Sequence, residues 1–148
     1  MLLRVSDGVA RRNLRLRRFA LVAEVQGLAS ERLTLQPGDF FVDAVPECDA
    51  YVVMEVIHAW DDADAVAILQ AVRRAAPAGA TLLLIEQMIP QDAGPHWAKT
   101  LDLHMLALLG GRQRSRTEYE ALMEAADFTF SQQTDTGAEV AILEGTAS

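Results

Sequence analysis

This sequence has few of the features that mark several common protein classes. It contains one cysteine, Cys48, so it can form neither an internal disulfide nor a cysteine-based zinc site, which fits a reducing cytoplasm. It has no uninterrupted apolar run near the roughly 18 residues that a membrane helix needs. It contains no G-x-G, so the usual phosphate-cradling glycine loop is absent. The sequence has no G-x-S-x-G elbow and no Cys–His pair, the motifs that would suggest a hydrolase.

Negative charge is abundant, but it is unevenly spread along the 148 residues. Residues 1–18 hold six arginines and one acid, which gives this segment a charge of +5. Because the whole chain has a net charge of −8, residues 19–148 have a net charge of −13. A body this acidic repels a phosphate backbone, which disfavours nucleic-acid binding except through the leader, where it would depend steeply on salt. We expect the Arg-rich leader, 1–18, to be a poorly ordered or unrelated terminus, with a transit peptide as the alternative.

The pattern of apolar residues predicts alternating strands and helices. In chain order we expect a helix over 19–28, strands over 32–36 and 49–57, a helix over 61–76, a strand over 80–89, helices over 97–109 and 117–126, and a hairpin of strands over 128–133 and 139–145. This order predicts an α/β fold with an open sheet that closes with an antiparallel hairpin. Ligands of such sheets bind beyond the carboxyl ends of the strands.

Three polar side chains, Asp39, His58 and Glu86, each follow a predicted strand, so we expect them to converge. A neutral imidazole accepts a proton near neutral pH, and a carboxylate such as Glu86 can orient it. A His–Glu pair is suited to deprotonating a hydroxyl. The alternative is a packing histidine whose ring is satisfied by backbone groups.

Other charged stretches allow two interpretations each. Asp62 and Asp64, with His58, could bind a metal, but acids in a first helical turn favour capping instead. Asp39, beside two aromatic residues, could hydrogen-bond an adenine amino group or simply form a turn. The basic "GGRQR" segment, 110–114, could approach an anion, although we expect a surface loop.

Five blocks together resemble a known family. They are "GDFF" (38–41), "DAYVVMEVIHAWDDADAVAIL" (49–69), "LLLIEQMIP" (82–90), "LDLHMLALLGGRQRS" (101–115) and "EYEALMEAADF" (118–128). Their order and spacing resemble S-adenosylmethionine-dependent O-methyltransferases, the group of plant caffeic acid and isoflavone enzymes and bacterial polyketide-tailoring relatives. The resemblance covers about residues 23–148. It implies a Rossmann-like sheet, S-adenosyl-L-methionine as cofactor, a small phenolic or polyketide-like hydroxyl acceptor, and no metal.

The resemblance also implies roles for individual residues. His58 stands at the position of the base that takes the hydroxyl proton, and Glu86 at that of the glutamate that supports it. Cofactor contacts are implied for Asp39, Phe40 and Met54, and acceptor contacts for Met105 and Trp60.

The sequence departs from the family at several points. The family's "GGGxG" loop and its amino-terminal helical domain have no counterpart. Ala59 replaces an acid, Gln113 replaces a second glutamate set against the histidine, and Asp127 stands where glycine is usual.

These departures predict that residues 19–148 form a partial catalytic domain whose sheet is incomplete at its amino-terminal side, with an exposed edge. A carboxy-terminal fragment, a misread frame and a shortened paralogue all fit. The alternative function is therefore an inactive fragment or binding module, either as a homo-oligomer or with a full-length homologue.

Overall fold

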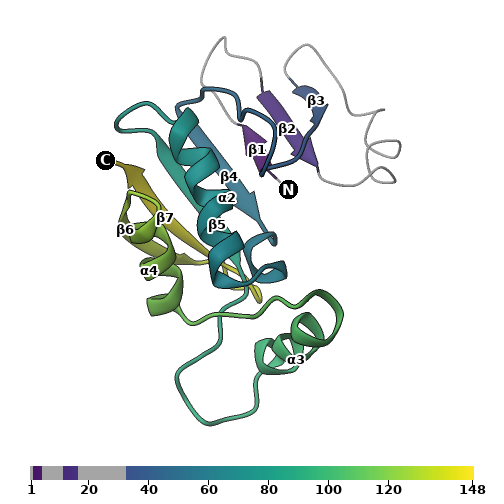
Figure 1. Ribbon diagram of the computed structural model, residues 1–148. Helices are drawn as coiled ribbons and strands as arrows, with labels where there is room; N and C mark the ends of the chain where they lie inside the picture. The colour runs from purple at the N-terminus through teal and green to yellow at the C-terminus, as the bar shows by residue number, and fades with distance from the viewer. Residues whose placement is uncertain (1, 5–11, 17–32) are drawn as a thin grey trace.

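The computed structural model describes residues 2–4, 12–16 and 33–148, and in this part of the chain seven strands form one sheet (Figure 1). The strands are β1 (Leu2–Arg4), β2 (Arg12–Leu16), β3 (Leu33–Pro37), β4 (Ala50–Met54), β5 (Thr81–Glu86), β6 (Phe128–Asp135) and β7 (Ala141–Ala147). The helices are the 3-10 turn η2 (Ile57–Ala59), α2 (Asp62–Ala75), α3 (Trp97–Leu109) and α4 (Arg116–Ala125). The predicted α/β sheet is confirmed, while the helix expected over 19–28 lies outside the described residues.

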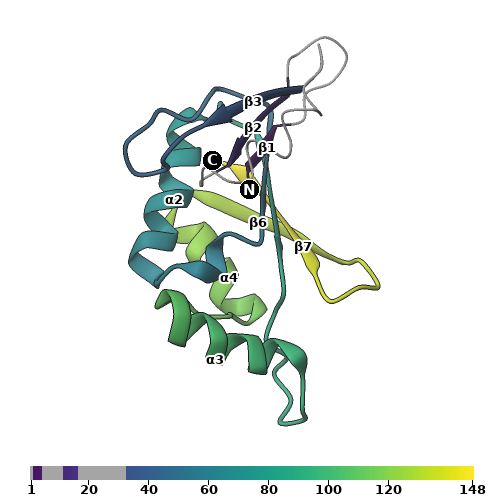
Figure 2. The same ribbon diagram turned by 90° about the vertical axis from the view of Figure 1, so that its right-hand side faces the viewer.

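The strand order is β3-β2-β1-β4-β5-β7-β6. β4 and β5 are parallel, and β7 runs antiparallel to β5 and to β6, which confirms the closing hairpin. Helices α2 and α4 lie side by side on one face of the sheet, whereas α3 lies beyond the end of the strands (Figure 2). The apolar face of α2, with Ile68, Leu69 and Val72 fully buried, closes the core over β4 and β5.

The edge of β4 that we expected to be open is paired in the structure. β1 lies antiparallel to β4 opposite Tyr51–Val53, and β2 and β3 extend the sheet beyond it. A strand in this place satisfies backbone groups of β4 that would otherwise lack partners. Two parts of the predicted leader, 2–4 and 12–16, are thus in the sheet. The rest of the leader lies outside the described residues, and the division between leader and domain stays a prediction.

The turn between α4 and β6 explains one departure from the family pattern. Asp127 has a φ of 59°, in the left-handed region where glycine is preferred. Aspartate tolerates this region better than most other residues, so the chain can keep the same turn.

Among the described residues, no helix has both the length and the apolar composition needed to cross a bilayer.

Candidate functional site

His58 and Glu86 are brought together by the parallel pairing of β4 and β5. Because the two strands run in the same direction, the turn after β4 and the last residue of β5 lie at the same edge of the sheet. The chain bends at Glu55, whose φ of 49° is unusual for a residue with a side chain, and then enters η2. His58 Nδ1 lies 2.7 Å from Glu86 Oε2.

Glu86 is a fully buried carboxylate, and its side-chain hydrogen-bond partners among the described residues are Val56, Ile57 and His58, at and just before η2. Its Oε1 accepts hydrogen bonds from the backbone N–H groups of Val56, at 3.0 Å, and Ile57, at 2.8 Å. Its Oε2 faces the His58 ring. A buried carboxylate needs such donors, and an ionised one can only accept, so it favours a proton on His58 Nδ1. Nε2 of the same ring is then the atom with a free lone pair, which is the arrangement that a general base requires.

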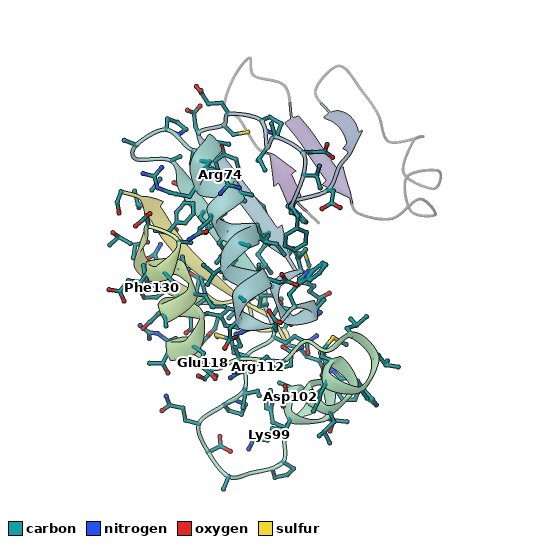
Figure 3. The ribbon with its side chains drawn as sticks, viewed as in Figure 1. Arg74, Lys99, Asp102, Arg112, Glu118 and Phe130 are labelled. Atoms are coloured by element: carbon teal, nitrogen blue, oxygen red, sulfur yellow. The ribbon has the colours of Figure 1, made fainter. Side chains whose placement is uncertain are left out.

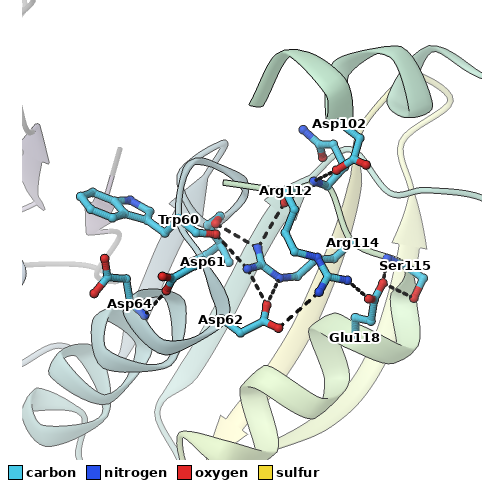
Figure 4. A network of polar contacts seen from close by, with 11 residues as sticks. Trp60, Asp61, Asp62, Asp64, Asp102, Arg112, Arg114, Ser115 and Glu118 are labelled. Atoms are coloured by element: carbon cyan, nitrogen blue, oxygen red, sulfur yellow. Dashed lines mark hydrogen bonds and ion pairs between the residues drawn. The ribbon is translucent and has the colours of Figure 1, made fainter. Parts of the chain in front are cut away.

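The prediction of a surface loop for 110–114 was wrong. Arg114 is fully buried and Gln113 is 1% exposed. The Arg114 guanidinium donates to Asp62 Oδ1 from Nε, at 2.9 Å, and from Nη2, at 2.7 Å (Figure 4). Burial is possible because Asp62 neutralises the charge from 52 positions away in the chain.

The same guanidinium also binds the turn that carries His58. Its Nη1 donates to the carbonyl oxygen of Ile57 at 3.1 Å, and its Nη2 to that of Trp60 at 2.9 Å. Gly111 packs against the turn as well, since a Cβ on it would lie 2.3 Å from the His58 carbonyl oxygen. The segment is therefore a buried support of η2.

The aspartates after η2 have structural partners. Asp61 is the N-cap of α2, and its side chain accepts a hydrogen bond from the Asp64 N–H at 2.9 Å, which confirms capping. Asp62 pairs with Arg114 and, at 3.3 Å, with Arg112. Within the described residues, no three His, Cys, Asp or Glu side chains are grouped so as to hold a metal ion.

Two further buried polar side chains adjoin this network. The Gln113 N–H donates to Asp102 Oδ1 at 2.7 Å, but both polar atoms of its side-chain amide are buried without a hydrogen-bond partner. Tyr119 is fully buried, and burial together with the negative charge of Glu86 raises the pKa of its hydroxyl well above the ordinary value. Tyr119 therefore stays protonated near neutral pH, so it is no competitor to His58 as a base.

The residues expected at the cofactor follow β3. Asp39 Oδ1 accepts a hydrogen bond from the Phe41 N–H at 2.9 Å, and the Asp39 N–H donates to Asp43 Oδ2 at 2.7 Å. Phe40 is 8% exposed and lies in the core, whereas Phe41 is 40% exposed. The Phe41 ring packs edge-on against Trp60 with centroids 5.1 Å apart. Sequence reasoning did not single out Phe41, and the adenine contacts of Asp39 and Phe40 stay predictions.

The two methionines expected at the site lie on different elements. Met54, the last residue of β4, is 36% exposed, and Met105 is half-buried on α3, a helix that contacts η2. Their contacts with cofactor and acceptor stay predictions, as does the acceptor contact of Trp60.

The chain matches the O-methyltransferase domain family over residues 20–129. It is 38% identical to phenazine O-methyltransferase PhzM of Lysobacter antibioticus over 107 residues, which are 72% of this chain and 31% of that protein. The fold is similar to the crystal structure of LaPhzM, with a TM-score of 0.85, 33% identity, and coverage of 94% of this chain and 43% of that one. It is also similar to human N-acetylserotonin methyltransferase in complex with SAM, with a TM-score of 0.81, 29% identity, and coverage of 90% and 39%. The chain thus spans less than half the length of these relatives.

Proposed function

Because this chain belongs to the O-methyltransferase domain family, we propose that it serves S-adenosylmethionine-dependent O-methylation of a small hydroxyl compound, phenolic or polyketide-like. The observation that carries the proposal is the contact of 2.7 Å between His58 Nδ1 and the buried Glu86 carboxylate. The relatives named for phenazine and N-acetylserotonin methylation support a small aromatic acceptor.

The chemistry assigned to this chain is proton removal. A hydroxyl is a poor nucleophile near neutral pH, and His58 Nε2 accepts its proton as the oxygen forms a bond to carbon. Glu86 stabilises the imidazolium that results and keeps the ring in one orientation. S-adenosylmethionine, when bound, would supply the methyl group from its sulfonium and would leave as S-adenosylhomocysteine.

The residues that would hold the cofactor fit its adenosine half. Asp39 offers a carboxylate, and Phe41 offers a half-exposed ring at the same edge. Met54 offers a polarisable side chain at the end of β4. The methionine half has no matching glycine loop in this sequence.

The proposal is tested by comparing methyl transfer in the wild type and two histidine variants. We expect His58→Ala to lower turnover by about a hundredfold or more, because a positioned base contributes that much. His104→Ala is the matched control, since His104 is exposed on α3, and we expect it to act like wild type. Turnover that persists in a folded His58→Ala variant would show that the base is elsewhere.

The alternative is a non-catalytic module that associates with a longer homologue. The neutral Gln113, at the position where the family has a second glutamate, favours it. Calorimetric titration with S-adenosylhomocysteine separates the two functions. Micromolar one-to-one binding supports the enzyme, whereas no heat from a folded sample, together with a stoichiometric complex with a full-length homologue, supports the module.

A further inference from the structure

Turn η2 is held between two buried charges of opposite sign. Glu86 accepts the N–H groups at the start of the turn, and Arg114 donates to the carbonyls of Ile57 and Trp60 at its end. The turn has little support of its own, with internal bonds of 3.1 Å from Ala59 N–H and 3.2 Å from Trp60 N–H. The hydrogen-bond geometry of a 3-10 segment is poorer than that of an α-helix, so these outside contacts add to the support of the turn.

Arg114 is suited to this place by its shape and by its partner. A guanidinium presents several N–H groups in one plane, so it can bind two carbonyls and a carboxylate at once, which a lysine ammonium on a flexible stem does less well. Asp62, the first residue of α2, orients that plane through Nε and Nη2. The end of η2 and the start of α2 are thereby joined through one side chain (Figure 4).

We infer that Arg114, oriented by Asp62, is a positioning residue for His58. It fixes the end of η2 so that the His58 ring stays on Glu86 with its proton on Nδ1 and with Nε2 free. This inference rests on the proposed function for its catalytic meaning, but the orientation of the ring can be measured without turnover. Losing the guanidinium lets the turn move, and the ring then leaves Glu86.

The experiment uses Arg114→Lys, which keeps the charge and removes the planar fork. The matched control is Arg112→Gln. Arg112 lies on the same segment and also pairs with Asp62, but the other partner of its side chain is Glu118 and not the η2 turn. Nitrogen NMR of the His58 ring reports which ring nitrogen carries the proton. We expect Nδ1–H in wild type and Arg112→Gln, and a mixture of both tautomers in Arg114→Lys. Where turnover is measurable, kcat falls about a hundredfold in Arg114→Lys, since small misplacements cost that much, with KM for S-adenosylmethionine unchanged.

The outcomes separate a positioning role from a structural one. If Arg114→Lys melts at a lower temperature but keeps the wild-type tautomer and kcat, Arg114 is only structural and the inference is overturned. If Arg114→Lys does not fold, Asp62→Asn is tested instead, because the Asp62 side chain is 58% exposed and asparagine keeps an oxygen that can accept from the Arg114 guanidinium while removing the charge that neutralises it. We expect a smaller shift in tautomer there, and an unchanged ring would overturn the inference. A shifted tautomer in Arg114→Lys, together with no methyl transfer by the wild type, would contradict the proposed function but would leave the positioning role of Arg114 intact.

Discussion

Turn η2 and helix α3 are neighbours that are held in different ways. The turn is held by hydrogen bonds to two charged side chains, Glu86 and Arg114, which are both fully buried. Helix α3, which carries Lys99 and Asp102 (Figure 3), buries only Ala98. It is held by polar contacts, including Asp102 with the Gln113 N–H and Lys99 Nζ with the Gly94 carbonyl at 2.6 Å. The large apolar side chains that α3 exposes are Trp97, Leu103, Leu106, Leu108 and Leu109.

This difference separates the chemistry of the site from its surroundings. Groups that move protons need fixed geometry, and buried charge pairs resist displacement because an unpaired charge is costly inside a protein. An apolar face of α3 in water contributes nothing to the stability of the described chain. The turn should therefore be sensitive to substitution, and the outer face of α3 should not.

The largest effect should come from Glu86→Ala. It leaves the N–H groups of Val56 and Ile57 and the His58 ring without their acceptor, so we expect the free energy of unfolding to fall by about 3–5 kcal/mol. Urea denaturation measures this, with Glu124→Ala, an exposed acid on α4, as the control. A loss no greater than that of the control would mean that the turn is held by other contacts.

Gly111→Ala should be next in size. The new Cβ would lie 2.3 Å from the His58 carbonyl oxygen, which is backbone and cannot swing away. We expect a loss of about 1–3 kcal/mol from the forced shift, and a displaced His58 ring signal in NMR spectra. Gly110→Ala is the comparison, because its φ of 72° strains any side chain but no atom lies within 4 Å. It should lower stability without moving His58, and equal effects on the ring would contradict the close packing.

Gln113→Met tests a buried polar group next to the turn. Methionine has nearly the same shape, and it removes two amide atoms that have no partner in the structure. We expect the free energy of unfolding to rise by about 1 kcal/mol, the smaller end of the cost of an unsatisfied buried group. A thermal melt measures it. Destabilisation instead would show that the amide has partners, such as bound water.

The smallest effect should come from Leu106→Ser on the outer face of α3. Leu106 is 65% exposed, so we expect a change within about 0.5 kcal/mol. Leu69→Ala, a fully buried position in α2, should cost about 2–5 kcal/mol under the same conditions. A large loss of stability in Leu106→Ser would contradict the expectation that the outer face of α3 tolerates substitution better than the η2 turn does.

Local patterns predicted most of the elements. The helix over 97–109 has the predicted bounds, and the strand expected over 80–89 is observed at Thr81–Glu86. The Asp61 cap was also predictable, because its partner is three residues away. The burial of Phe40 rather than Phe41 could not be predicted, because the local sequence does not indicate which of two neighbouring aromatic residues enters the core.

By itself, the sequence determined the order of strands and helices from β3 onward and the residue types at the strand ends, because apolar periodicity and capping are local. It placed His58 and Glu86 after neighbouring parallel strands, so their meeting could be expected. Only the tertiary structure decided that Arg114 is buried, since the charge that permits its burial belongs to Asp62, on another element. An arginine in a basic loop segment favours solvent, and it enters the interior only where the fold supplies an acid and carbonyl groups that accept its N–H groups.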